Sequence, residues 1–281
     1  MEDKLLQRRA AGKLRCALVT RQTAQLLLAG ALVLGQAGCM TPVLGPDELT
    51  EEEKVLDQAE ARRDLGIDYL AKGQNVIALR EFLFSVENNP DDPVTQLWLG
   101  EAYRRQRHDD KALAAMLRAV ELDSRFREAH NNLSAFYLQL ERYEEAIEHA
   151  QVLIEDPLYN RPWKAFSNRG WAQYKLERIS EARTSLETAL EFRNDFWPAS
   201  LNLGILEAES GNTVKAVKQF RRVIENTAAQ GPRAEASFRV AQILVSMGHR
   251  TKAIKYFTAS VKTAPESTWA EESRDYLKIL R

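Results

Sequence analysis

Small, apolar and polar positions recur along residues 59–267 with a period of about 34 residues. Each period holds two stretches in which apolar residues fall at helical spacing, separated by a turn, which predicts a pair of short antiparallel helices. Six such units follow one another, starting at residues 59, 93, 127, 163, 197 and 234. Because one pair of helices cannot bury its apolar face alone, the units are expected to stack into an all-α solenoid.

Two positions of the unit carry small residues. The eighth position holds glycine, serine or alanine: Gly66, Gly100, Ser134, Gly170, Gly204 and Ala241. The twentieth position holds alanine every time: Ala78, Ala112, Ala146, Ala182, Ala216 and Ala253. We expect the two helices of a unit to cross closely at these positions, because a side chain larger than a methyl group would hold them apart.

Large apolar residues recur at two further positions and are expected to fill the core. They are Leu65, Leu99, Leu133, Leu203 and Val240 at the seventh position, and Phe82, Met116, Leu186, Phe220 and Phe257 at the twenty-fourth. The fifteenth position holds Gly73, Gly211 and Gly248 in three units, as expected for the turn between paired helices. This pattern predicts a tetratricopeptide repeat (TPR) solenoid of six helix-turn-helix repeats over residues 59–267, with residues 268–281 as a C-terminal capping helix.

The repeat has two kinds of irregularity. Units three and five are longer than the others, which places residues 156–162 and Gln230-Gly231-Pro232 in predicted widened loops. Arg169 and Gln173 stand at positions seven and eleven of unit four, where most other units have an aliphatic residue or tyrosine. The first helix of unit four is therefore expected to pack differently from the others.

Residues 1–38 have the order of a secretory signal, with a basic beginning and an apolar stretch over residues 26–34. This stretch is shorter than the about 20 residues that a membrane-spanning helix needs. It runs into Gly35-Gln36-Ala37-Gly38-Cys39, which resembles the lipobox of bacterial lipoproteins, with Gln36 where that motif usually has an aliphatic residue. We therefore expect a lipoprotein signal peptide over residues 1–38 and a lipid on Cys39 that anchors the chain in a membrane. A plain export signal is the alternative.

Residues 39–58 are expected to form the lipidated cysteine and a tether. Pro42, Gly45 and Pro46 interrupt regular structure there, and an acidic run follows. Thr50 and Glu53 have the spacing of a capping box, in which the threonine caps the helix that follows.

The charge balance and the missing motifs exclude several classes of protein. The 281 residues carry 39 Lys and Arg against 40 Asp and Glu, so no nucleic-acid partner is expected. The sequence contains none of the motifs of phosphate-binding loops, serine hydrolases or zinc peptidases. Its four histidines, His108, His130, His149 and His249, lack the spacing of metal ligands. We expect a binding protein with no catalytic residues, no metal site and no cofactor.

The first helices of TPR units line one face of a solenoid, and that face commonly holds a segment of another protein. The residues predicted to bind a peptide there are Trp98, Arg105, Asn132, Asn168, Trp171, Tyr174 and Asn202. The three asparagines all stand at position six, where their amides could pair with the backbone of an extended ligand. The alternative, that they pair with neighbouring helices, stays open. Trp163 and Trp197 are expected to pack between units, and Trp171 to be exposed in the groove.

A family resemblance rests on three features together: the lipobox, the six TPR units, and Asp156-Pro157-Leu158-Tyr159 followed by Asn168-x-Gly170. In these the chain resembles the type IV pilus pilotins of the PilF/PilW/Tgl group. The resemblance implies a lipoprotein on the periplasmic face of the outer membrane. Its partner would be the secretin of the type IV pilus machine, whose subunits it helps to reach that membrane and assemble into the ring through which the pilus passes.

Two other functions compete with this one. A periplasmic TPR lipoprotein could instead be an adaptor that scaffolds other envelope proteins, such as cell-wall hydrolases. A cytoplasmic TPR co-chaperone is a third class, and the export signal argues against it.

Overall fold

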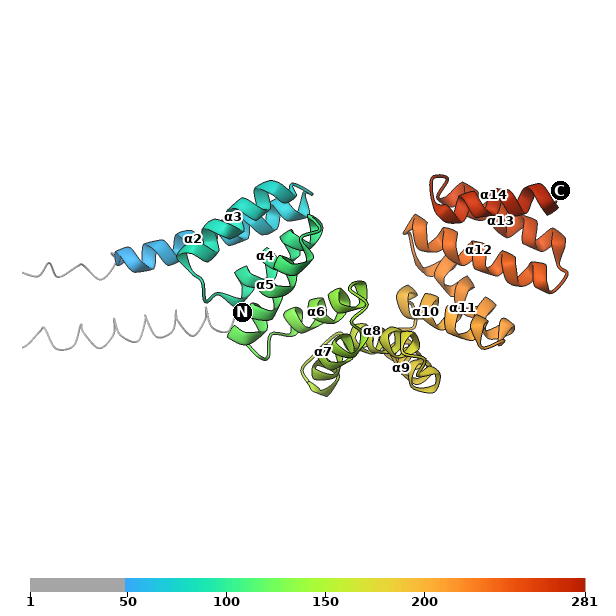
Figure 1. The fold of residues 1–281 in the computed structure, drawn as a ribbon, viewed down its shortest axis with the longest axis horizontal. Helices are drawn as coiled ribbons and strands as arrows, with labels where there is room; N and C mark the ends of the chain where they lie inside the picture. The colour runs from blue at the N-terminus through green and yellow to red at the C-terminus, as the bar shows by residue number, and fades with distance from the viewer. Residues whose placement is uncertain (1–48, 281) are drawn as a thin grey trace, which may run out of the picture. The chain divides into compact units, whose positions relative to one another are not determined.

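The computed structural model describes residues 49–280, which form thirteen α-helices and, over that range, no β-strand (Figure 1). The helices are α2 (Glu51–Ala71), α3 (Asn75–Asn88), α4 (Pro93–Arg105), α5 (Asp109–Leu122), α6 (Arg127–Gln139), α7 (Tyr143–Glu155), α8 (Pro162–Lys175), α9 (Ile179–Phe192), α10 (Trp197–Glu209), α11 (Thr213–Asn226), α12 (Gln230–Ser246), α13 (Arg250–Thr263) and α14 (Thr268–Leu280). None of these thirteen helices is both long and apolar enough to cross a membrane. The expected signal peptide and Cys39 lie outside the described residues.

The helices pack as six consecutive pairs, from α2 with α3 to α12 with α13. The second helix of each pair also contacts the first helix of the next unit. First helices of neighbouring units touch directly in several places, as α6 and α8 do, and α8 and α10. One side of the array is therefore formed by first helices and the other by second helices, which confirms the predicted all-α TPR solenoid.

The small residues at position eight lie against the large residues at position twenty-four. A Cβ atom added to Gly66 would come within 2.7 Å of the Phe82 ring. In unit three, where position twenty-four holds Ala150 and not a large residue, the Ser134 hydroxyl donates a hydrogen bond to the carbonyl oxygen of Ala146, at 2.9 Å. All six alanines at position twenty are fully buried. The close crossing predicted from the sequence is thus present.

One predicted core residue is not in the core. Leu65 at position seven is 38% exposed, whereas Leu99, Leu133 and Val240 at the same position are buried. Leu65 lies in α2, which packs against α3 and α4, and within residues 49–280 no helix pair precedes α2 to cover this face. The prediction was wrong because the period describes an inner unit and Leu65 belongs to the first one.

The turn at position fifteen has a left-handed backbone in every unit. The φ angle is 74° at Gly73, 78° at Gly211 and 74° at Gly248, and it is 61° at Arg107, 58° at Glu141 and 61° at Glu177. Units two, three and four therefore reach the same turn with a residue that has a Cβ atom, which is less favourable.

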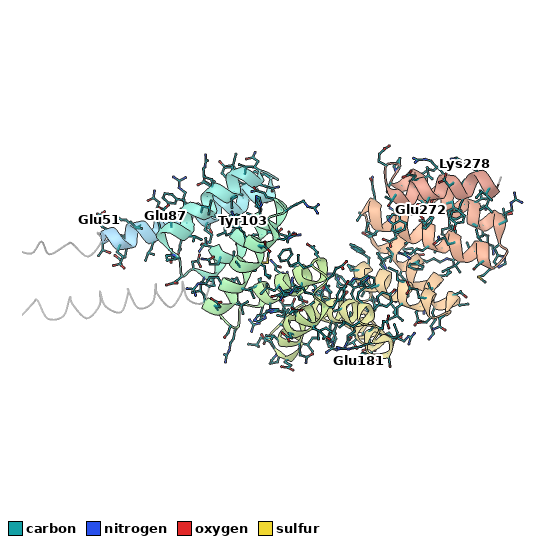
Figure 2. All side chains as sticks on the ribbon, viewed as in Figure 1. Glu51, Glu87, Tyr103, Glu181, Glu272 and Lys278 are labelled. Carbon is teal, nitrogen blue, oxygen red and sulfur yellow. The ribbon has the colours of Figure 1, made fainter. Side chains whose placement is uncertain are left out.

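The capping box at the start of α2 is present. The Glu53 backbone N–H donates to Thr50 Oγ1 at 3.2 Å, and the Thr50 N–H donates to Glu53 Oε2 at 2.9 Å. Glu51, Glu52 and Glu53 place negative charge at the positive end of the helix dipole, and Glu51 is labelled in Figure 2. As a result the helix begins at Glu51, and residues 51–58 of the predicted tether are helical.

Only one of the two predicted widened loops is a loop. Residues 156–161 connect α7 to α8 without helical structure. Residues 230–232 instead form the first turn of α12. Pro232 fits there because the first backbone N–H groups of a helix have no intrahelical acceptor, so the missing N–H of proline costs no hydrogen bond.

Unit four is held by a polar network where other units have apolar contacts. Arg169 Nε donates to Ser185 Oγ at 3.1 Å, and its Nη1 donates to Gln151 Oε1 at 2.8 Å. Ser185 Oγ in turn donates to Gln173 Oε1 at 2.7 Å. The network joins α7, α8 and α9, which explains why this unit departs from the repeat at positions seven and eleven.

The last helix, α14, packs against both α13 and α12. It buries Leu277, and its Trp269 and Tyr276 rings lie 5.4 and 6.0 Å from the Phe238 ring. These contacts cover the apolar residues that the sixth unit would otherwise expose.

Candidate peptide-binding surface

Two hollows lie between α4 and α6 on the side formed by the first helices. The two hollows share lining residues, and their volumes are about 390 Å³ and about 100 Å³. Arg104, Phe136 and Gln139 line both, Arg105 lines the larger and Asn132 the smaller. The structure therefore places two of the predicted site residues, Arg105 and Asn132, in the linings of two hollows that share three residues.

Arg105 is held within the protein. Its Nε donates to Glu101 Oε1 at 3.0 Å, and its Nη1 donates to the carbonyl oxygen of Leu70 at 2.7 Å. Arg104 donates to both carboxylate oxygens of Glu101, at 2.7 and 2.8 Å. Burial alone would raise the pKa of Glu101, but the two guanidinium groups hold its pKa below the usual value. Glu101 therefore stays charged at neutral pH and fixes both arginines at the edge of the hollows.

The three asparagines at position six are all half-buried but differ in their partners. Asn132 Oδ1 accepts a hydrogen bond from Asn131 Nδ2 at 3.3 Å, and Asn131 Oδ1 accepts one from the Tyr159 hydroxyl at 3.2 Å. Across residues 49–280, the Asn168 and Asn202 amides form no hydrogen bond with another residue. Asn132 thus pairs with a neighbour on its own helix and not with another helix.

Trp171 and Tyr174 form an aromatic pair at the boundary of units four and five. Their ring centroids are 4.9 Å apart and their planes lie at 27°. Both rings pack against a core cluster that includes Leu201 and Ile205 of α10. Burial, together with a hydrogen bond from its hydroxyl to Glu209, raises the pKa of Tyr174 to about 12. Trp171 is half-buried, so the expectation of an exposed indole was only partly right.

The other three tryptophans considered in the sequence pack within the array. Trp163 lies against the cluster around Leu186, and Trp197 lies against the cluster of units five and six, as predicted. Trp98, which we expected in the groove, is half-buried against the cluster of units one and two. The predicted site residues therefore occupy several neighbouring places along the first helices and do not converge in one hollow.

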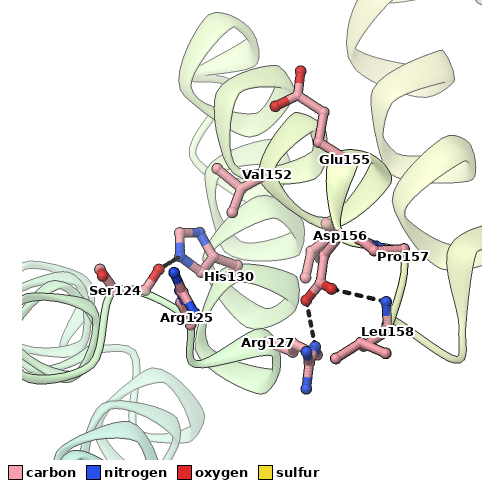
Figure 3. A pocket seen from close by; sticks show the side chains of 10 residues that line it. Ser124, Arg125, Arg127, His130, Val152, Glu155, Asp156, Pro157 and Leu158 are labelled. Carbon is pink, nitrogen blue, oxygen red and sulfur yellow. Dashed lines mark hydrogen bonds and ion pairs between the residues drawn. The ribbon is translucent and has the colours of Figure 1, made fainter.

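A separate hollow of about 420 Å³ lies beside the loop between α7 and α8 (Figure 3). Asp156 shapes this loop, because its carboxylate accepts hydrogen bonds from Arg127 Nε and, at 2.8 Å, from the backbone N–H of Leu158. The bond from Arg127 lowers the pKa of Asp156. Leu158 is left 75% exposed, and Val152 on the same rim is 42% exposed. The Asp-Pro-Leu-Tyr segment thus displays apolar side chains at the edge of a charged hollow.

His130 lines this hollow and pairs with His149 of α7. Their Nδ1 atoms are 2.9 Å apart, and His130 Nε2 lies 3.1 Å from the carbonyl oxygen of Ser124. Because a carbonyl only accepts, His130 carries its proton on Nε2, so its Nδ1 accepts from His149 Nδ1. Tyr137 stacks on His149 with a centroid distance of 5.4 Å. Burial, and then the neighbouring His130, lower the pKa of His149 to about 4.

Sequence reasoning missed both the histidine pair and the anchoring carboxylate Glu101. The two histidines are 19 positions apart on different helices, so no local spacing reveals their contact. Glu101 could have been found, because it stands three and four residues before Arg104 and Arg105, the spacing of ion pairs on one helix face.

Comparison with known proteins places the repeats in a family. A tetratricopeptide repeat model matches residues 63–125, 110–160 and 167–234, and a second one matches residues 234–267. Human tetratricopeptide repeat protein 16 is 26% identical over 181 residues, which are 60% of this chain and 21% of that protein. The chain thus spans about a fifth of the length of this curated relative.

Two solved structures share the fold over most of the chain. PilF of Pseudomonas aeruginosa superposes with a TM-score of 0.67 at 19% identity, covering 79% of this chain and 99% of that one. PilW, a widely conserved type IV pilus biogenesis factor, superposes with a TM-score of 0.68 at 20% identity, covering 76% of this chain and 97% of that one. At these identities the likeness shows the fold. The repeat models cover most of residues 63–267, and the chain belongs to the tetratricopeptide repeat family.

Proposed function

We propose that this chain is a pilotin, an outer-membrane lipoprotein that binds secretin subunits and promotes assembly of the secretin ring for type IV pilus biogenesis and pilus-based motility. The observation that carries the proposal is the structural similarity to PilF and PilW. The superposition with this chain covers 99% of the PilF structure and 97% of the PilW structure. The lipobox ending in Cys39 supports a lipid anchor on the periplasmic face of the outer membrane. In this proposal the chain acts by binding and not by catalysis.

The first helices offer the groups that a secretin segment needs. The Asn168 and Asn202 amides can pair with the backbone of an extended segment, since each has a donor and an acceptor. The Trp171–Tyr174 pair offers a flat apolar surface to an anchoring side chain. Arg104 and Arg105, held by Glu101, add fixed positive charge near the hollows between α4 and α6.

A triple variant tests the binding surface. Asn168→Ala, Asn202→Ala and Trp171→Ala together remove two hydrogen bonds worth about 0.5–1.5 kcal/mol each and an anchor worth about 2 kcal/mol. Binding is expected to weaken by roughly a hundredfold or more. The measurement is the ratio of heat-resistant secretin multimer to monomer on a gel, in cells where the variant accumulates normally. The multimer is expected to fall.

A matched control places similar truncations on the second helices. Phe192 in α9 is 56% exposed, and Asn226 ends α11. Phe192→Ala with Asn226→Ala is expected to leave the multimer unchanged. An unchanged multimer-to-monomer ratio in the triple variant would show that the first-helix surface does not bind the secretin. The exposed Leu158 in the α7–α8 loop would then be the next candidate contact. Co-purification of the unaltered chain with cell-wall hydrolases, and not with a secretin, would support the adaptor alternative instead.

A further inference from the structure

The second helices change the sign of their charge along the array. Helices α3, α5, α7 and α9 each carry more acidic than basic residues. Helix α11 carries four basic residues and one acidic residue, and α13 carries four basic residues and no acidic one. The basic residues are Lys215, Lys218, Arg221 and Arg222 of α11, and Arg250, Lys252, Lys255 and Lys262 of α13. Since the whole chain has a net charge of −1, this is a local excess of positive charge.

These eight cations have no carboxylate partner within residues 49–280, unlike most arginines of the earlier units. The paired arginines include Arg62, Arg63, Arg80, Arg104, Arg105, Arg118, Arg127, Arg142 and Arg178. By contrast, Arg221 donates to the Tyr256 hydroxyl, Arg222 to the Asn194 carbonyl and Arg250 to the Leu280 carbonyl, all uncharged acceptors. Unneutralised cations on neighbouring helices repel one another and attract an anionic partner.

Five of these eight cations line two hollows. The first, of about 510 Å³, lies between α11 and the α12–α13 turn, and Lys218, Arg221, Arg222 and Lys252 line it together with one acidic residue, Glu225. Val214 and Met247 also line it, and they are 77% and 48% exposed. This hollow therefore combines positive charge with exposed apolar surface.

The second hollow, of about 440 Å³, lies between α13 and α14 and is lined by Lys262, Arg274 and Lys278, with no acidic residue in its lining. Lys278, labelled in Figure 2, also pairs with Asp275 at 2.9 Å. Lys252 of the first hollow and Lys262 of the second lie on one helix and are about 15 Å apart along its axis. An extended segment covers that distance with about five residues.

We propose that this surface, formed by α11, α13 and α14 and called the basic face, binds an acidic segment of a partner protein. The carboxylates of the segment lie over the unpaired lysines, and its apolar side chains contact Val214 and Met247. A protein segment suits the surface better than a membrane does, because the cations surround recesses between helices, whereas a bilayer surface contacts what protrudes. The basic face is formed by the second helices α11 and α13 and the capping helix α14, so it shares no helix with the surface proposed for the secretin.

Binding of a synthetic peptide tests the proposal. The probe is a fluorescein-labelled peptide of repeated Glu-Glu-Leu triplets, and its control has glutamine in place of each glutamate. Fluorescence anisotropy with the purified full chain in about 50 mM NaCl is expected to show binding of the acidic peptide only, weakening at about 300 mM NaCl as the charges are screened. Lys218→Glu, Lys252→Glu and Lys262→Glu together are expected to weaken binding by at least about tenfold.

The control variant makes the same change in net charge elsewhere. Lys54→Glu, Arg107→Glu and Arg125→Glu alter exposed side chains in the first turn of α2 and in unit two, and Glu already occupies the position of Arg107 in units three and four. This variant is expected to bind the acidic peptide within about twofold of the unaltered chain. Equal loss in both variants, or equal binding of the two peptides, would overturn the proposal.

Two further results would also overturn it: no binding of the acidic peptide in low salt, or binding of phosphatidylglycerol vesicles in its place, which would make the basic face a membrane contact. Circular dichroism checks that both variants are folded. Secretin multimer formation is measured separately with the first-helix variants, so failure here leaves the proposed function untouched.

Discussion

The fifteenth residue of each unit shows how strongly the fold constrains a single backbone position. All six residues have positive φ, yet only three are glycine. A Cβ atom added to Gly73, Gly211 or Gly248 would meet nothing within 4 Å, so space does not explain the glycines. The cost at this position lies in the backbone conformation itself, which disfavours any residue with a Cβ atom.

Glycine at the other three turns is expected to stabilise the protein. Glu141→Gly and Glu177→Gly should each raise the free energy of unfolding by about 1 kcal/mol, because they relieve the left-handed strain and remove a negative charge near a helix C-terminus. Arg107→Gly should raise the free energy of unfolding by less, because it removes a favourable positive charge near a helix C-terminus. Urea unfolding followed by circular dichroism measures the effect. Gly211→Ala is the matched control and should lower the free energy of unfolding by about 1 kcal/mol. If none of the three glycine variants has a higher free energy of unfolding than the unaltered chain, this account is contradicted.

At the scale of helices, the same close crossing recurs in the units, while polar contacts within and between units differ from place to place. Gly66 against Phe82 and Gly204 against Phe220 are repeats of one apolar arrangement. Arg169 joins units three and four by hydrogen bonds, and the His130–His149 pair joins the two helices of unit three. A hydrogen bond between side chains is lost when one partner is removed or changes its protonation state. The free energy of unfolding is therefore expected to depend on pH and on single substitutions at these contacts.

The histidine pair is expected to make the stability of unit three depend on pH. The pKa of His149 is lowered to about 4 in the folded chain, so between that value and about 6.5 the unfolded chain binds more protons. Stability from this group is therefore present near neutral pH and is lost as the pH falls through this window. The loss should be on the order of 2 kcal/mol, because the side chain is partly exposed.

Urea unfolding at pH 7 and at pH 4.5 measures this loss. His149→Leu should be less stable at neutral pH but should lose less stability on acidification than the unaltered chain. His108→Leu, at an exposed turn position, is the control and should behave like the unaltered chain. The same acid sensitivity in all three proteins would assign it to the carboxylates instead.

At the scale of the whole molecule, the proposed function depends on where the chain is held. If Cys39 carries a lipid, Cys39→Ala should move the protein from the membrane fraction to the soluble periplasmic fraction, because acyl chains supply about 0.8 kcal/mol per buried methylene. Cys16→Ala, within the expected signal peptide, is the control and should remain membrane-bound. Membrane retention of the Cys39 variant would mean that the apolar stretch over residues 26–34 serves as the anchor.

The sequence by itself determined the features that depend on short spacings. The period of the small and large residues predicted the helix pairs and their close crossings, because sterics at one contact decide which residues fit. Thr50 and Glu53 predicted the helix start, since a capping box acts over three residues. Leu65 and residues 230–232 were misjudged because an average period does not register the end of an array or a proline tolerated in a first turn.

Only the tertiary structure decided which side chains meet across units and what remains unpaired. It placed Arg105 against the Leu70 carbonyl and joined His130 to His149, and among the described residues it left the cations of α11 and α13 without carboxylate partners. These outcomes depend on how successive helix pairs are placed against each other, which sums many weak contacts between residues far apart in the sequence. The spacing of residues along one helix reports only contacts within that helix, so contacts between units are visible only in the packed structure.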